Sequence, residues 1–251
     1  MSFRRAFGAL LAAFCLCFSA TAHAEPWTRK SFLMPEGSFE ITGDPARPTL
    51  MDINLSRDSV GRPVTISPHF YWAPSDDLSL GISHETGLCL NECDKVYNDA
   101  GFDLMYYLTG SNRFELDLHV GLPVHSFDPL FVGARAGVIG RLNIGDITAF
   151  VFDPSLYIGF SNRDRGNREY LYLPVWFYFQ ATETVVPFVG TAVHGPLDGF
   201  GDAVQIPIEG GVLFNVTQNV DLGVGLRFGN LLGRGGSVDW RDLMFLARFR
   251  F

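Results

Sequence analysis

The feature that most constrains this chain is a two-residue alternation of apolar and other side chains that runs to its last residue. Every second position near the C-terminus is apolar: Leu243, Phe245, Ala247, Phe249 and Phe251. The positions between them are Asp242, Met244, Leu246, Arg248 and Arg250. A period of two is typical of a β-strand, in which successive side chains point to opposite faces. The apolar face of such a strand must contact either a protein core or lipid.

The same alternation recurs upstream, clearly in residues 64–72, 114–123, 204–215 and 220–229. Read along the whole chain, it predicts about twelve strands. We place them near residues 48–56, 62–72, 78–85, 101–109, 113–123, 130–142, 147–160, 169–180, 185–194, 203–216, 220–230 and 240–251. An even number of strands in a membrane barrel returns both ends of the chain to the periplasmic side.

The connections between these strands alternate in length. The odd-numbered connections are 57–61, 86–100, 124–129, 161–168, 195–202 and 231–239, and the even-numbered ones are 73–77, 110–112, 143–146, 181–184 and 217–219. Apart from a tie between the first two, the odd set is longer. Short turns at one end and longer loops at the other are typical of transmembrane β-barrels. We therefore predict an all-β fold, a closed antiparallel transmembrane barrel over residues 48–251, with a secreted soluble β-sandwich as the alternative.

The first residues have the pattern of an export signal. Arg4 and Arg5 precede an apolar run over residues 6–18, and Ala22 and Ala24 provide a small-x-small cleavage site. The apolar run is too short to cross a membrane as a helix. We predict a signal peptide over residues 1–24, with a retained N-terminal helix as the alternative.

Residues 25–47 separate the signal peptide from the first predicted strand. Pro26, Pro35 and Pro45 make long regular structure doubtful there, although residues 37–42 allow a short strand. We expect a short N-terminal segment that either hangs in the periplasm or folds into the lumen.

The strand that ends at Phe251 resembles the terminal strand of Gram-negative outer-membrane β-barrel proteins, whose last residue is commonly Phe. The resemblance covers this strand and the general pattern upstream, and it indicates no subfamily. It implies an outer-membrane location, with Phe249 and Phe251 as part of the signal read by the barrel-assembly machinery. The implied partners are that machinery, the lipid bilayer and lipopolysaccharide, and the oligomeric state stays open.

Strand parity points a mixed set of charged side chains into the lumen. The acids are Asp52, Asp103, Glu115, Asp117, Asp153, Glu209, Asp221 and Asp242, and the arginines are Arg135, Arg141, Arg227, Arg248 and Arg250, with His69 and His119 beside them. One interpretation is a salt-bridge network that fills the barrel. The other is a set of charged rings that selects solutes, with the excess of acids mildly favouring cations.

Adjacent strands also predict which of these charges are neighbours. We expect Glu115 and Asp117 to lie beside Arg135. By the same reasoning, the C-terminal strands place Asp221 and Arg227 beside Arg248 and Arg250.

Bulky aromatic side chains share the inward parity, namely Tyr71, Tyr107, Tyr157, Tyr172, Trp176 and Tyr178. A barrel of about twelve strands lies between small filled barrels and wide porins, so these rings leave a narrow bore or none. We predict a narrow pore or transport channel for ions or small solutes. A non-conducting structural or surface-interaction barrel is the first alternative, and an outer-membrane lipid hydrolase is the second.

The sequence assigns no catalytic residues and no metal or cofactor. Ser83 and His84 are adjacent and therefore point to opposite faces of a strand, which disfavours them as a nucleophile and base. His125 and His194 also lie near the predicted extracellular rim. The net charge of −8 comes without a basic stripe, so nucleic acid is not an expected partner.

Cys89 and Cys93 lie in the longest predicted extracellular loop, and an oxidising compartment favours a disulfide between them. Free thiols and a metal site are weaker interpretations, because few other ligand side chains are near. The charged loop 162–168 either contacts lipopolysaccharide phosphates or stays solvated. Aromatic girdles are expected from Trp72, Phe160, Phe179 and Phe251 at periplasmic ends and from Trp240 at an extracellular end.

Overall fold

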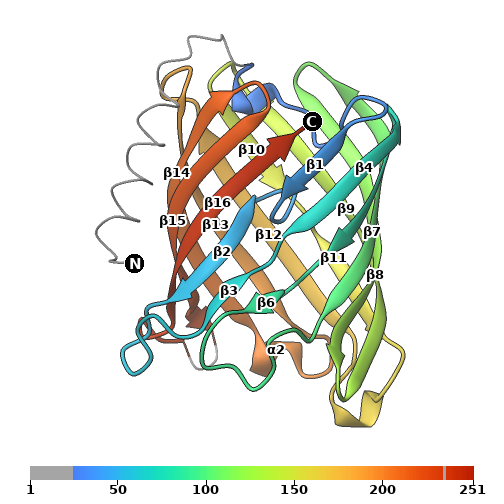
Figure 1. Cartoon of the computed structure of the whole chain (residues 1–251), viewed down its shortest axis with the longest axis vertical. Coiled ribbons are helices and arrows are strands. Elements are labelled where there is room, and N and C mark those ends of the chain that lie inside the picture. The colour runs from blue at the N-terminus through green and yellow to red at the C-terminus, as the bar shows by residue number, and fades with distance from the viewer. Residues whose placement is uncertain (1–24, 234–235) are drawn as a thin grey trace, which may run out of the picture.

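The computed structural model describes residues 25–233 and 236–251, so the predicted signal peptide lies outside the described residues. The described chain forms one closed antiparallel β-barrel (Figure 1). Its strands are β1 (Phe39–Thr42), β2 (Thr49–Asn54), β3 (Val64–Ile66), β4 (His69–Ser75), β5 (Leu78–Ser83), β6 (Leu88–Cys89), β7 (Ala100–Ser111), β8 (Phe114–Phe127), β9 (Leu130–Ile144), β10 (Thr148–Phe152), β11 (Ser155–Gly159), β12 (Tyr170–Phe179), β13 (Val185–Pro196), β14 (Gln205–Thr217), β15 (Val220–Gly233) and β16 (Arg241–Arg250).

These segments make up twelve barrel strands in the described part of the chain, which confirms the predicted all-β fold and strand number. β3 with β4, and β10 with β11, are single strands with an interruption, and β6 is a short extension beside β3. Pro68 and Pro154 lie in the two interruptions, and a proline has no N–H with which to continue a strand ladder.

The first barrel strand consists of two halves, β1 and β2, and the residues between them enter the interior of the barrel. β16 closes the barrel by pairing with both halves: Leu243 lies opposite Ile53 of β2, and Arg250 lies opposite Glu40 of β1. Residues 43–48, here called the inner loop, leave the wall between the two halves. Gly43 permits this departure, because a Cβ there would lie 2.0 Å from the carbonyl oxygen of Thr49.

The barrel therefore begins at Phe39, earlier than the predicted boundary at residue 48. β1 has only four residues and is followed by Gly43 and Pro45, so its alternation is too short to mark a spanning strand. The sequence boundary was wrong because a strand completed by two separated halves leaves no continuous ten-residue pattern.

The two ends of the barrel differ in the length of their connections. The lower end in Figure 1 carries residues 55–63 and 84–99 and the short helices η2 (Arg163–Arg165) and α2 (Phe200–Ala203), and the upper end carries tight turns. Longer loops are typical of the extracellular end. The predicted loop 124–129 is wrong in length, because β8 and β9 continue to Phe127 and Leu130 and leave a two-residue turn. Phe160 follows β11 at the long-loop end, so its expected periplasmic position is also wrong.

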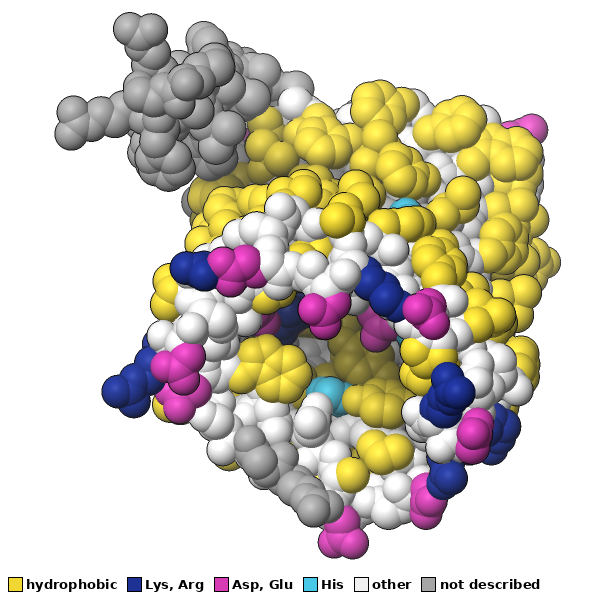
Figure 2. Space-filling model, turned by 60° about the horizontal axis from the view of Figure 1, so that its bottom comes forward, with side chains coloured by type: hydrophobic (Ala, Val, Ile, Leu, Met, Phe, Trp, Pro, Cys, Tyr) yellow, Lys and Arg dark blue, Asp and Glu magenta, His cyan; other side chains and the backbone are white. Residues whose placement is uncertain are grey.

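The outer wall is apolar. Large hydrophobic side chains exposed on it include Ile82, Phe102, Leu122, Phe177 and Val189, each at least 46% exposed. Apolar side chains also dominate the outer wall in the space-filling view (Figure 2). A soluble protein rarely exposes so large an apolar surface, whereas a membrane barrel places it against hydrocarbon. No helix in the described residues is long and apolar enough to cross a membrane.

Candidate functional site

The interior of the barrel is occupied at its periplasmic end by the chain's own N-terminal segment. Residues 25–36, here called the N-terminal plug, include the short helix η1 (Trp27–Arg29). Trp27, Phe32, Leu33 and Met34 are each 5% exposed or less. The Trp27 ring lies 3.9 Å, centroid to centroid, from the ring of Tyr178 on β12. Burying each such side chain contributes about 1.5–3 kcal/mol, so the plug is part of the hydrophobic core.

A buried ion pair fixes the middle of the plug. The Lys30 ammonium lies 2.8 Å from an Asp221 carboxylate oxygen and 2.7 Å from the side-chain oxygen of Asn215. The Lys30 and Asp221 side chains are 3% and 1% exposed. Burial lowers the pKa of Lys30, and the attraction of Asp221 opposes that shift. The strand register places Asp221 opposite Arg248 on β16, as the sequence predicted. Its ion-pair partner is Lys30 of the plug, which the sequence analysis did not include.

A second polar contact holds the plug through Glu115. One carboxylate oxygen of Glu115 accepts hydrogen bonds from the Ser31 hydroxyl and from the Phe32 backbone N–H, the latter at 3.0 Å. Its other oxygen lies 2.6 Å from Arg141, which also donates to the backbone carbonyls of the plug. The predicted contact between Glu115 and Arg135 was wrong, because strand register places Glu115 opposite Arg141.

The inner loop crosses the lumen beyond the plug. Arg47 forms an ion pair with Glu209 on β14, and Glu209 also accepts a hydrogen bond from the indole N–H of Trp176. The Tyr178 hydroxyl donates to the Ala46 carbonyl at 2.9 Å. Arg248 donates to the Pro45 carbonyl at 2.6 Å. The inner loop is thus bound to the wall by side chains of three strands.

Arg227 does not lie beside Arg248 or Arg250 as predicted, because the register places it opposite Asp242. Arg250 lies 2.6 Å and Arg248 lies 3.7 Å from the Glu40 carboxylate on β1. Arg227 lies 3.0 Å from Asp242 and 3.4 Å from Asp52. The predicted charge neighbours did not include Glu40, because the sequence analysis did not assign residues 39–42 to the barrel wall.

A buried network of charged and polar groups joins β4, β7, β8 and β9. His119 Nδ1 lies 3.0 Å from the Asp153 carboxylate, and Arg135 contacts the same imidazole. Arg135 also lies 3.4 Å from Asp103, which accepts a hydrogen bond from the Tyr71 hydroxyl at 3.4 Å. Buried charges persist when they are paired in this way.

Asp117 is fully buried next to Glu115. The sequence predicted that Asp117 would lie beside Arg135, and this prediction is wrong. Arg135 instead lies opposite Gly121 in the strand register, farther along β8.

The lumen contains a cavity towards each end. The periplasmic cavity, of about 730 Å³, lies between the plug and the turns at residues 110–113 and 145–146. The extracellular cavity, of about 290 Å³, is lined by aromatic side chains and by Arg47 of the inner loop. Figure 2 shows the extracellular end hollowed, with apolar side chains and a histidine inside and charged side chains around the rim.

Trp240 lines the extracellular cavity, so its predicted place in an aromatic girdle is wrong. Parity puts it on the same face as the buried Asp242. Gly229 lies opposite, and a Cβ there would lie 2.5 Å from the indole ring. The missing side chain at Gly229 therefore gives the Trp240 ring room inside the barrel.

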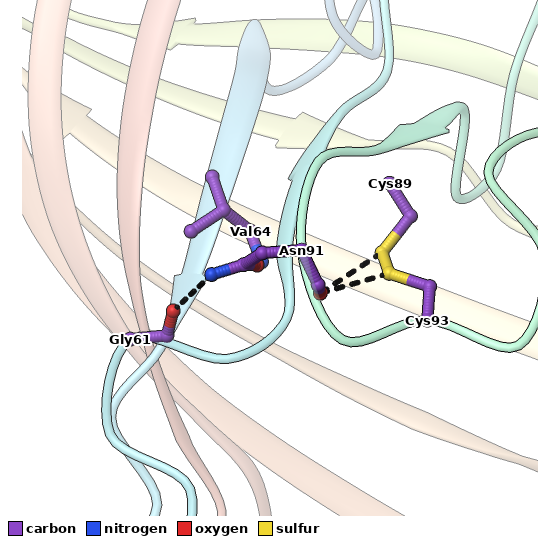
Figure 3. The surroundings of a disulfide bond; sticks show 5 residues. All are labelled: Gly61, Val64, Cys89, Asn91 and Cys93. Atoms are coloured by element: carbon purple, nitrogen blue, oxygen red, sulfur yellow. Dashed lines mark hydrogen bonds between the residues drawn. A yellow bond between two sulfur atoms is a disulfide. The ribbon is translucent and has the colours of Figure 1, made fainter.

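The disulfide between Cys89 and Cys93, which was predicted from the sequence, is confirmed. Asn91 lies between the two cysteines, and its side chain ties the loop to the preceding connection (Figure 3). It donates to the Gly61 carbonyl at 2.9 Å and accepts from the Val64 N–H at 2.6 Å. The disulfide loop is thereby held beside β3 at the extracellular rim.

The histidines of the rim contact groups other than serine hydroxyls. His125 pairs with Glu85, and His194 contacts the Tyr170 hydroxyl. His84 contacts the Pro68 carbonyl at 2.5 Å and the Tyr97 hydroxyl at 3.0 Å. In the described residues, the partners of these three histidines are carbonyl, carboxylate and phenol oxygens.

Comparison with known proteins identifies the fold. Solved structures similar to this barrel include the KdgM porin, at 9% identity, covering 85% of this chain and 98% of that chain, with a TM-score of 0.56. The NanC porin is similar at 3% identity over 85% of this chain and 98% of that chain, with a TM-score of 0.55. No family model and no curated protein sequence matches this chain. The chain has the fold of Gram-negative outer-membrane β-barrel porins.

Proposed function

We propose that this protein is a narrow outer-membrane pore for ions or small solutes. The supporting observation is a lumen that contains a cavity towards each end, with the plug and the inner loop between the two. A barrel with only a structural role has no need of polar cavities lined by charged side chains. One similar solved structure is the KdgM porin in complex with disordered oligogalacturonate, so a barrel of this fold can hold a solute.

The lining favours small solutes and weak charge selection. Arg47, Arg141 and Arg227 each face an acidic partner, so the charges largely cancel along the bore. The excess of inward acids over arginines mildly favours cations. The plug and the inner loop exclude large solutes by volume.

The remaining assignments concern export and surface contacts. Residues 1–24 are proposed to be a cleaved signal peptide, and Phe249 and Phe251 to take part in recognition by the barrel-assembly machinery. Phe251 is 70% exposed at the end of β16, which leaves it accessible to such a partner. In the loop 162–168, Arg163 already pairs with Glu169 and Arg168 with Asp198, so lipopolysaccharide phosphates would compete with these pairs.

We expect purified, folded protein to give small, stepwise currents in a planar lipid bilayer. The steps should be weakly cation-selective and insensitive to solutes too large to enter the cavities. Folding is checked first by the difference in gel migration between boiled and unboiled samples. A silent membrane that contains correctly folded barrels would instead support a non-conducting role.

A further inference from the structure

Aromatic rings line the extracellular cavity, and the ring of Trp240 has a face that is open to the cavity. Trp240 is 47% exposed although it points into the barrel, and Gly229 behind it lets the indole lie flat against the wall. Tyr172 lines the same cavity, with His194 edge-on to it at 5.9 Å between ring centroids. Aromatic faces of this kind pack against the C–H faces of ring-shaped ligands and exclude water from them.

The charged groups around these rings are already neutralised. Arg47 pairs with Glu209 at the floor, and Arg227 lies 3.0 Å from Asp242. At the rim, Glu85 pairs with His125. A charged ligand would have to break one of these pairs or be buried without a counter-charge, and both are costly.

An uncharged hydroxylated ligand avoids that cost. A guanidinium has five N–H donors, and a carboxylate has about four acceptor positions, so each ion pair keeps free sites for ligand hydroxyls. The Trp240 face supplies the complementary apolar surface. The cavity volume of about 290 Å³ is at the lower end of the range for small-molecule sites and suits one or two sugar-sized rings.

We propose that this cavity binds neutral sugars, or uncharged rings of similar hydroxylation, as the solute class of the pore. This inference rests on the proposed function, because it names what enters the channel from the extracellular side. Trp240 is the stacking surface, Arg47 and Glu209 form the polar floor, and Arg227 supplies a further donor.

The test is direct binding of maltose and cellobiose to the folded barrel in a detergent without a sugar headgroup. Titration is followed by tryptophan fluorescence and by calorimetry, with digalacturonate and choline as the charged probes. We expect saturable binding of at least one neutral disaccharide and weaker binding of both charged probes. Trp240→Ala should weaken sugar binding about tenfold, since the stacking surface is lost.

Trp72→Phe is the matched control, because Trp72 is 43% exposed on the outer wall. It should leave binding unchanged. Tighter binding of either charged probe, no saturation by the neutral disaccharides, or equal binding by the Trp240→Ala variant would each overturn the proposal. Binding is measured in solution without current, so a barrel that binds sugar but is silent in bilayers refutes the pore alone. A barrel that conducts without binding refutes this inference alone.

Discussion

A chain that begins at Gly37, and so lacks the N-terminal plug, is expected to give current steps several-fold larger than those of the whole protein. The plug buries Trp27, Phe32, Leu33 and Met34 inside the barrel, and its removal opens that volume to water. The wall keeps its strand pairing, because β1 begins only at Phe39. Single-channel recording in planar bilayers measures the effect.

The deletion needs a check on folding, since it also exposes apolar side chains such as Tyr178 on the inner wall. The variant must still migrate differently when boiled and unboiled. If a folded variant gives steps of the same size as the whole protein, the plug does not limit the current, and the proposed route through the lumen is wrong.

The second large effect is expected from the buried pair of Lys30 and Asp221. Removing one partner leaves an uncompensated buried charge, which costs about 3–5 kcal/mol. Lys30→Met alone and Asp221→Leu alone should each destabilise the protein by about this amount. The double variant should recover much of the loss, because an apolar pair of similar size needs no counter-charge. Urea unfolding in lipid, followed by gel migration, gives the free energies.

The matched control is the pair of Arg168 and Asp198, whose side chains are 51% and 81% exposed in the extracellular loops. Arg168→Ala should change the free energy of unfolding by about 1 kcal/mol or less, since solvent screens exposed pairs. Single variants of Lys30 and Asp221 that are equally mild would contradict the docked position of the plug.

The sequence predicted the wall well because the wall obeys a local rule. Outward positions on β8, β15 and β16 alternate with inward ones over ten or more residues, and lipid contact requires that pattern. A short strand was allowed over residues 37–42, but β1 was not assigned to the wall, because four residues next to Gly43 and Pro45 carry too little alternation. Where a strand is assembled from two halves, the information lies in the pairing with β16 and not in the local sequence.

Asp221 lies opposite Arg248 as predicted, but several ion-pair partners of the lumen charges were missed for a related reason. Strand parity predicts contacts only between adjacent strands of the wall. Asp221 pairs with Lys30 and Glu209 pairs with Arg47, and both of these basic residues lie outside the predicted wall. One signal was present: the apolar run 32–34 sits in a proline-rich segment that has no strand pattern of its own. An apolar run after an export signal and before a barrel favours burial in the lumen over a free periplasmic tail.

Thiol protection tests most directly whether the N-terminal plug lies inside the lumen of the folded barrel. Leu33→Cys and Glu36→Cys place single thiols on the same segment, one 5% exposed and the other exposed to solvent. The protein is prepared from Glu25 onwards, without Cys15 and Cys17, and Cys89 and Cys93 do not react because they form a disulfide. In the folded protein, a water-soluble maleimide should label the cysteine at position 36 rapidly and the cysteine at position 33 far more slowly. In urea, where the protein is unfolded, the two cysteines should be labelled at equal rates. Equal labelling of the two positions in the folded barrel would contradict the account.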